Sequence, residues 1–311
     1  MRAGQATSSN LHEAAFNGMR WLERASRQPE GFTSDEARAF LIVRRNALDP
    51  FLTDYARRLH RRLITSYKMD MRRLRELTHP NGFIDYLSFC VQSEELGAKH
   101  RQKDRVVKAV LERGNEFFQN VWPRKHHYLN CLALINYYHF KRLRVPLQLT
   151  MEKIIESCGA TALDRSVELS QDEFEQQLYF VTHWAYALSD YGCAPLNPRE
   201  HTRLYRFLRR VLPEALESGN LETLAEVVGC LKIFGHRNGD IFLRPALRNI
   251  LRRQNPDGSW GSVVYGTARH TTCIAVLALY EYRAHQKSKW GPVARRSLLK
   301  NAASRRWVAS V

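Results

Sequence analysis

Helix-length segments of two kinds alternate along the second half of the chain, and this alternation restricts the possible folds more than any other feature. One kind is apolar on nearly every side and covers residues 126–140, 173–191, 221–235 and 268–283. The other is amphipathic and basic and covers residues 104–119, 150–159, 200–218 and 240–254. A helix that is apolar all round must be buried, whereas an amphipathic helix covers it. The alternation recurs every ~45 residues, as in stacked helix-pair repeats.

The residues between these segments agree with helix boundaries. Ser170 and Asn220 are suited to cap helix N-termini, and Gly192 and Gly235 are suited to the left-handed position that follows a helix. Alternating strand patterns of Val, Ile and Thr are almost absent. We therefore predict an all-α chain, folded as an α/α toroid of inner and outer helix pairs.

The same pattern predicts three parts of the chain. Residues 1–100 are expected to form N-terminal helices that complete or cap the toroid, although their inner or outer roles do not follow from the pattern. Residues 101–285 hold the helix-pair repeats of the toroid. Residues 286–311 form a basic C-terminal tail.

The segment 254–261 reads QNPDGSWG. It resembles the QW repeat of squalene-hopene and oxidosqualene cyclases, in which the Gln caps an outer helix, the Asp-Gly pair makes a turn and the Trp stacks on the Gln. The resemblance implies that Gln254, Asp257 and Trp260 tie neighbouring helix pairs together. It is a structural motif and implies no particular reaction.

The segment 269–279 reads RHTTCIAVLAL. It resembles a stretch of protein prenyltransferase β-subunits whose His is a zinc ligand, and the resemblance places His270 at that position. The family's Asp-x-Cys pair has no match, because Asp190 and Cys193 are one residue too far apart. The D-x-D-D, D-D-x-x-D and N-S-E motifs of terpene cyclases and synthases are also missing. Over residues 120–285 the whole pattern most resembles small stand-alone toroid proteins of bacterial natural-product pathways.

Polar residues recur at matching levels of the apolar segments. When three of these segments are aligned on their C-terminal ends, His183 is level with Glu226, and His270 is level with Glu222. The two levels are four residues apart, so they lie one turn apart on the same face. Asp190 follows His183 by two turns. Five polar side chains are thus predicted to point one way from neighbouring buried helices.

Such groups are costly on a buried helix unless they are paired or bound to something. One interpretation is a metal site in which His183, Glu226 and His270 bind zinc or iron. Asp190 or Glu222 would then orient the ligands. Together with Tyr179, which is level with Glu222, these two carboxylates are the candidate catalytic residues. Two alternatives stay open: a metal-free acid–base or binding site, and a hydrogen-bonded network that only fixes helix register.

The composition restricts partners and location. Lys plus Arg is 48 against 31 for Asp plus Glu, a formal net charge of +17, which attracts anions such as phosphorylated substrates, acidic proteins or nucleic acid. No apolar run approaches the ~18 residues of a membrane span, and the start of the chain carries no apolar leader segment. The six cysteines form no C-x-x-C pair, so we expect a reduced, cytoplasmic protein.

These observations predict a soluble metal-dependent enzyme of specialised metabolism. Its small, largely apolar or carrier-bound substrate would react inside the toroid lumen, with zinc as a Lewis acid or non-haem iron, and an acidic carrier protein is a possible partner. A second hypothesis is a metal-free toroid that holds a lipid, prenyl or polyketide ligand without converting it. A basic interaction scaffold is a third, and nucleic acid ranks last among the partners, since charge alone argues for it.

Overall fold

The computed structural model describes residues 8–28, 32–77, 80–120, 127–145, 147, 150–158, 160–164, 168–262 and 267–282. Within these ranges the regular elements are all helical, and the prediction of an all-α chain is confirmed. They are α1 (Ser8–Ala25), α2 (Ser34–Asn46), α3 (Pro50–Ser66), α4 (Met71–Glu76), α5 (Pro80–Glu95), α6 (Lys103–Asn120), α7 (His127–Arg142), α8 (Met151–Cys158), the 3₁₀ helix η1 (Ala160–Leu163), α9 (Gln171–Leu188), α10 (Thr202–Glu217), α11 (Leu221–Ile233), α12 (Arg244–Arg252) and α13 (Ala268–Leu279). The tail 286–311 and His126 lie outside the described residues.

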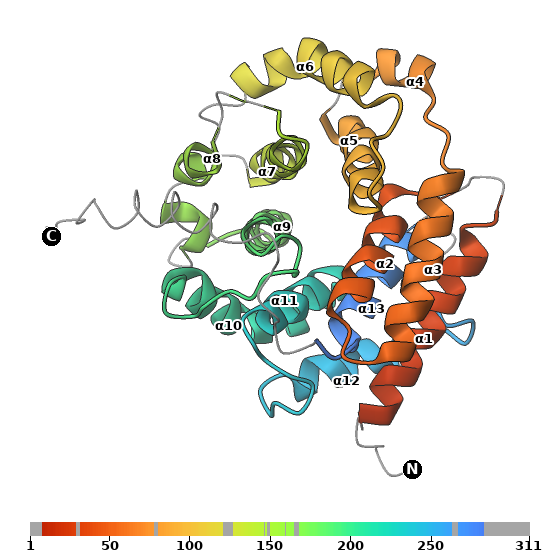
Figure 1. Cartoon of the computed structure of the whole chain (residues 1–311). Coiled ribbons are helices and arrows are strands. Elements are labelled where there is room, and N and C mark those ends of the chain that lie inside the picture. The colour runs from red at the N-terminus through yellow and green to blue at the C-terminus, as the bar shows by residue number, and fades with distance from the viewer. Residues whose placement is uncertain are drawn as a thin grey trace, which may run out of the picture.

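Six helices, called the central helices below, contact one another in a closed cycle. In order they are α2, α5, α7, α9, α11 and α13, and α13 contacts α2 again. The helices α3, α6, α8, α10 and α12 each pack on a central helix, and α1 packs on α13. Figure 1 shows the helices arranged around a common middle. The four segments that the sequence pattern predicts to be buried, α7, α9, α11 and α13, are all central helices.

The first hundred residues supply two members of this cycle, α2 and α5. The start of α2 is well specified by its sequence, since Thr33 and Glu36 form a capping box, which satisfies two backbone N–H groups reciprocally. The starts of α9 and α11 are capped by Ser170 and Asn220, as the sequence predicts. None of the described helices combines the length and apolar composition needed to cross a bilayer.

The QNPDGSWG segment joins the last helix pair to the first helix. Gln254 Nε2 donates to the carbonyl of Ala14 in α1 at 3.0 Å, and Asp257 accepts from Trp21 Nε1 at 2.9 Å. Trp260 is fully buried and donates its indole N–H to a carbonyl of α12 at 2.7 Å. Gly258 has a φ of 94°, and a Cβ there would lie 2.9 Å from a backbone oxygen of α1, so only glycine fits this turn. The segment therefore fastens α12 and α13 to α1.

Candidate functional site

His270 lies between two carboxylates that come from the central helices on either side of it. Its Nδ1 is 3.0 Å from Asp35 Oδ2 of α2, and its Nε2 is 3.1 Å from Glu222 Oε1 of α11. A carboxylate only accepts hydrogen bonds, so both ring nitrogens donate and the imidazole is charged. Burial opposes this charge, but the hydrogen bonds and charges of Asp35 and Glu222 outweigh burial and raise the pKa of His270 well above its usual value.

The two carboxylates respond in the opposite direction. Burial alone would raise their pKa values, but the hydrogen bond and the charge of His270 lower the pKa of both Asp35 and Glu222. Each is the second residue of its helix, where the helix dipole favours a negative charge. The Asp35–His270–Glu222 group, called the carboxylate–histidine bridge below, is therefore a stable ionised unit that links α2, α13 and α11.

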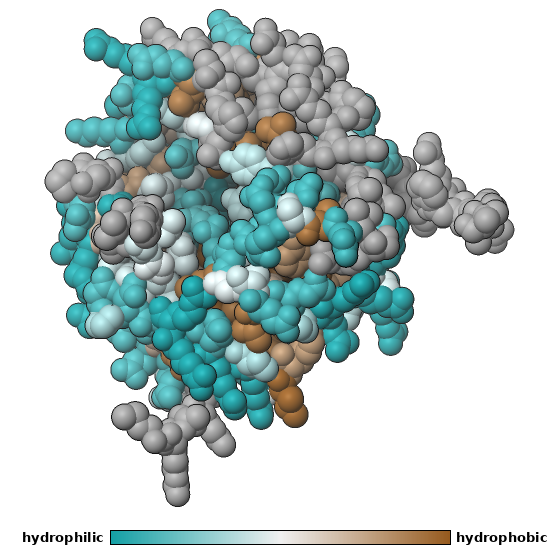
Figure 2. All heavy atoms as spheres, turned by 180° about the vertical axis from the view of Figure 1, so that it is seen from behind, coloured by the Kyte–Doolittle hydropathy of each residue, from teal (hydrophilic) through white to brown (hydrophobic). Residues whose placement is uncertain are grey.

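Water reaches this bridge although the surrounding helices are buried. The side chains of Asp35, Glu222 and His270 are 36%, 31% and 31% exposed. Glu222 is the one residue of α11 that is not buried, and only Arg269 and His270 are not buried in α13. Figure 2 shows a hollow near the middle of the face seen from behind, with hydrophilic residues in it. The residues of α11 and α13 that are not buried, which are Glu222, Arg269 and His270, are thus all ionisable.

Glu226 lies one turn from Glu222 on α11 and has a different environment. It is 1% exposed, and its Oε2 accepts from Thr182 Oγ1 of α9 at 2.6 Å. Its Oε1 is buried and has no hydrogen-bond partner among the described residues. Burial, together with the charge of Glu222, raises the pKa of Glu226 to about 8. A buried carboxyl beside a like charge keeps its proton, so Glu226 is neutral at pH 7.

His183 of α9 is also neutral. Its Nδ1 is 2.9 Å from the carbonyl oxygen of Tyr179, so Nδ1 carries the hydrogen and Nε2 presents a lone pair. Burial lowers the pKa of His183 to about 4, against the effect of that hydrogen bond and with the charges of Arg38 and His270. The Tyr179 and His183 rings are 4.3 Å apart between centroids. Burial raises the pKa of Tyr179 well above its usual value, so this phenol keeps its proton.

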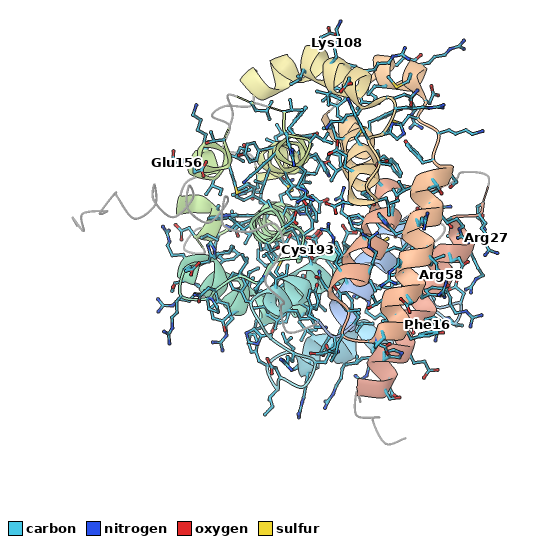
Figure 3. The ribbon with its side chains drawn as sticks, viewed as in Figure 1. Phe16, Arg27, Arg58, Lys108, Glu156 and Cys193 are labelled. Carbon is cyan, nitrogen blue, oxygen red and sulfur yellow. The ribbon has the colours of Figure 1, made fainter. Side chains whose placement is uncertain are left out.

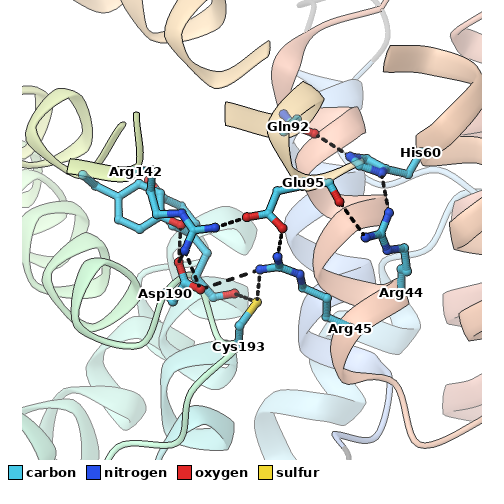
Figure 4. A network of polar contacts seen from close by, with 10 residues as sticks. Arg44, Arg45, His60, Gln92, Glu95, Arg142, Asp190 and Cys193 are labelled. Carbon is cyan, nitrogen blue, oxygen red and sulfur yellow. Dashed lines mark hydrogen bonds and ion pairs between the residues drawn. The ribbon is translucent and has the colours of Figure 1, made fainter. Parts of the chain in front are cut away.

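Asp190, the remaining candidate, belongs to a second cluster. It accepts from Tyr138 Oη at 2.6 Å and from Arg142 Nη1 at 3.3 Å, and Arg142 and Arg45 both pair with Glu95 (Figure 4). The sequence predicts Asp190 on the same face as His183 only if the helix reaches residue 190, but α9 ends at Leu188. Asp190 has a φ of 53°, so the chain has already left the helical path. Among the described residues, its hydrogen bonds and ion pairs are with Tyr138, Arg142 and Arg45, and none is with the other candidate residues.

The donor set does not fit a metal ion in this arrangement. Among the described residues, no three His, Cys, Asp or Glu side chains come together as ligands. Both nitrogens of His270 face carboxylates, and a charged imidazole has no lone pair for a metal. In this structure the side chains of His183, Glu226 and His270 are thus not arranged as metal ligands, and the zinc or iron site remains a prediction from the sequence.

Two residues of the candidate site were not predicted from the sequence. They are Asp35 and Arg38, both on α2. Arg38 Nη1 is 3.8 Å from Asp35 Oδ1, and its guanidinium lies 4.9 Å from the centroid of the Tyr191 ring. The capping box at Thr33 marks the start of α2, and it is the local sequence feature that places Asp35 in the first turn of a helix. It does not tell which helix α2 will face, because the contact with His270 spans 235 positions of the chain.

A family model described as a domain of unknown function, DUF6895, matches residues 23–280. This range covers well over half of the chain and includes all six central helices. The chain therefore belongs to the DUF6895 family. No curated protein and no solved structure matches the chain.

Proposed function

We propose that the chain is an α/α toroid that acts as an acid–base enzyme on a small molecule held between its central helices. The closed cycle of contacts from α2 to α13 supports the toroid. The QNPDGSWG segment, which fastens α12 and α13 to α1, supports the resemblance to the terpene cyclase and prenyltransferase β-subunit superfamily. Within that architecture the bridge is a charged group at the starts of α2, α11 and α13 that water reaches.

The observation that carries the proposal is the contrast between Glu222 and Glu226. Side chains four residues apart on a helix are neighbours, with Cβ atoms about 5–6 Å apart. His270 keeps Glu222 ionised, whereas burial keeps Glu226 protonated with a pKa of about 8. Neighbouring carboxyl groups whose pKa values are driven apart form the usual arrangement of a catalytic base and a catalytic acid. Glu226 would donate a proton to the substrate, and Glu222 would accept one.

The other residues have supporting roles in this proposal. His270 and Asp35 act as positioning residues, since they hold Glu222 ionised and fix one of its two oxygens. Glu222 Oε2 is then left for the substrate. His183 presents its Nε2 lone pair as a second acceptor, and Tyr179 packs beside it.

The charges of the site point to the class of substrate. Asp35 and Glu222 are balanced by His270 and Arg38, and Glu226 and His183 are neutral. A balanced site favours an uncharged molecule with a hydroxyl or carbonyl group that takes part in the proton transfers. This agrees with the small, largely apolar substrate that the sequence predicts.

The test combines a titration with an activity comparison. Carbon-13 NMR of the glutamate carboxyl groups, assigned with Glu226→Gln and Glu222→Gln, should show one group titrating near pH 8. Wild type incubated with metabolite extract should convert compounds that neither variant converts, and conversion should fall as the pH rises through about 8. An ordinary acidic pKa for Glu226, or conversion by both variants at the wild-type level, would refute the proposal.

The metal-dependent enzyme is the second candidate, favoured by the resemblance of segment 269–279 to a zinc-binding stretch. It requires His270 to exchange a carboxylate for the metal, as metal ligands are often neutral histidines oriented by a carboxylate. Elemental analysis of the purified protein and of His183→Ala and His270→Ala distinguishes it. Stoichiometric zinc or iron that both variants lose would support it over the metal-free proposal. A hydrophobic molecule extracted from a protein that converts nothing would instead support the ligand-binding alternative.

A further inference from the structure

Two neighbouring outer helices, α10 and α12, present arginine side chains on the outside of the molecule. The exposed arginines, called the arginine face below, are Arg203, Arg206, Arg209, Arg210, Arg244, Arg248, Arg252 and Arg253. The two helices contact each other and both cover α11. Figure 3 shows side chains with nitrogen ends extending outward from both helices. Neither helix contains a lysine, and α12 contains no acidic residue.

The outward direction of these arginines follows from the helical period. The buried residues of α10 are Leu204, Phe207, Leu208, Val211, Leu212 and Ala215, and those of α12 are Ala246, Leu247 and Ile250. Apolar residues at three- and four-residue spacing form one stripe, so the arginines occupy the opposite side. Arg203, Arg206 and Arg210 share one face of α10, and Arg244, Arg248 and Arg252 share one face of α12.

Helix stability does not explain this placement. Positive charges are unfavourable near a helix N-terminus, and negative charges are unfavourable near a C-terminus. Arg203 is the second residue of α10 and Arg244 is the first of α12, whereas Glu214 and Glu217 lie at the end of α10. The charges along α10 thus run against the helix dipole. A role outside the helix accounts for them better than a role within it.

Contacts within the protein use only some of these guanidinium groups. Arg209 lies 5.0 Å from the centroid of the Phe242 ring, Arg253 donates to the carbonyl of Gly219 at 2.6 Å, and Arg244 reaches a carbonyl at 3.4 Å. Five others form no hydrogen bond or ion pair with the part of the chain that the structure describes: Arg203, Arg206, Arg210, Arg248 and Arg252. These five keep their donors for a partner.

The chemistry of the arginine face favours an acidic protein over nucleic acid. Guanidinium groups pair with carboxylates through two parallel hydrogen bonds, and protein interfaces are enriched in arginine and depleted in lysine. A large apolar residue also lies in this surface: Ile241 is 77% exposed, next to Phe242, whose ring contacts Arg209 of α10. A protein partner would cover an exposed isoleucine, whereas a phosphate backbone gains nothing from it.

We infer that the arginine face docks an acidic segment of another protein. Carboxylates of that segment pair with the free guanidinium groups of α10 and α12, and an apolar side chain covers Ile241. This inference does not depend on the proposed chemistry, since the arginine face lies on the outer side of α11 from the carboxylate–histidine bridge.

The test uses a fluorescently labelled 18-residue helical peptide with glutamates at four-residue spacing and one leucine beside them. Binding is measured by fluorescence anisotropy at two salt concentrations. Arg203→Gln/Arg206→Gln/Arg210→Gln should weaken binding at least about tenfold, because charge-assisted hydrogen bonds are the strong class. Ile241→Ser should weaken it about threefold, as expected for losing part of one buried apolar side chain.

The matched control carries the same change in charge on another outer helix. Arg57, Arg58 and Arg61 of α3 are exposed, so Arg57→Gln/Arg58→Gln/Arg61→Gln should change peptide affinity less than about twofold. An equal loss in this control would show that only the overall charge matters and would overturn the docking site. Binding of an 18-nucleotide RNA that is weakened by the α10 variant, with no effect of Ile241→Ser on peptide or RNA, would assign the face to nucleic acid and overturn the protein partner.

Discussion

Two polar clusters lie at opposite ends of the central helices, and their charged side chains are paired in different ways. The carboxylate–histidine bridge is at the starts of α2, α11 and α13, and the second cluster is at the ends of α2, α5, α7 and α9. On α2, Asp35 and Arg45 belong to one cluster each, and ten residues separate them by about 15 Å.

In the second cluster each carboxylate faces arginines. Glu95 pairs with both Arg45 and Arg142, and Asp190 lies 3.6 Å from Arg45 and 3.3 Å from Arg142. The cavity beside this network measures only about 20 Å³, which is room for about one water molecule. Satisfied, tightly packed charges of this kind fix the geometry of neighbouring helices. This cluster links the ends of α2, α5 and α7 to the turn that follows α9.

The bridge differs because its neighbours are left incompletely satisfied. Within the described part of the chain, one buried oxygen of Glu226 has no hydrogen-bond partner, and the hydrogen bond of His183 uses Nδ1, which leaves the Nε2 lone pair. Strongly shifted pKa values at a water-accessible position are typical of functional sites. The second cluster thus pairs all its charges beside a very small cavity, whereas water reaches the paired charges of the bridge, and the buried, neutral Glu226 and His183 lie next to them.

The largest expected effect concerns the second cluster. Glu95→Ala leaves two arginines, each less than 20% exposed, without their main partner. Breaking a buried pair in this way should lower the free energy of unfolding by about 3–5 kcal/mol, measured by urea denaturation. A loss below about 1 kcal/mol would mean that the cluster does not hold the helices together, and the contrast with the bridge would disappear.

A smaller loss is expected at the bridge. His270→Ala removes two charge-assisted hydrogen bonds and leaves Asp35 and Glu222 without a cation between them. Because these side chains are about one-third exposed, water compensates in part, and we expect a loss of about 2 kcal/mol. The variant should also raise the pKa of Glu222 toward and above its ordinary value, which carboxyl NMR detects. An unchanged Glu222 titration would show that His270 does not keep it ionised.

Glu226 predicts a dependence of stability on pH. Its pKa is about 8 in the folded protein against an ordinary value near 4.5, so the folded state binds one proton more between these pH values. Its stabilising contribution is complete below about pH 4.5 and is lost as the pH rises through 8. The slope is about 1.4 kcal/mol per pH unit within this window. Glu226→Gln should lack this loss, so the difference between the two denaturation curves at pH 5, 6, 7 and 8 isolates it.

The smallest effect is expected at Asp190. Asp190→Asn keeps an oxygen for the Tyr138 hydroxyl but removes the charge that faces Arg45 and Arg142. Since Glu95 still pairs with both arginines, we expect a loss of about 1 kcal/mol and no change in the titration of Glu226. A shift in the Glu226 pKa would show that the two clusters are coupled, contrary to their placement at opposite ends of α2.

Several features were predictable because they depend on residues close together in the chain. The buried character of α7, α9, α11 and α13 follows from their apolar composition, and the caps at Ser170 and Asn220 follow from local hydrogen bonding. The alignment of helix ends also placed His270 level with Glu222, and these side chains are in contact at 3.1 Å. That success rested on a repeat, since equal helix pairs bring equivalent positions to equal heights.

The tertiary structure determined which charged side chains are in contact. Asp35 reaches His270 across 235 positions because α13 packs against α2 when the cycle of helices closes, and no local period encodes that contact. Asp190 contacts the arginines of the second cluster because α9 ends two residues before it. Its side chain therefore does not lie on the predicted face. The sequence by itself determined that helices would be buried and which of their positions would be polar, since periodicity and composition act within a helix. Only the packing of distant helices decided whether each polar group found a partner, because pairing depends on distances that the fold alone sets.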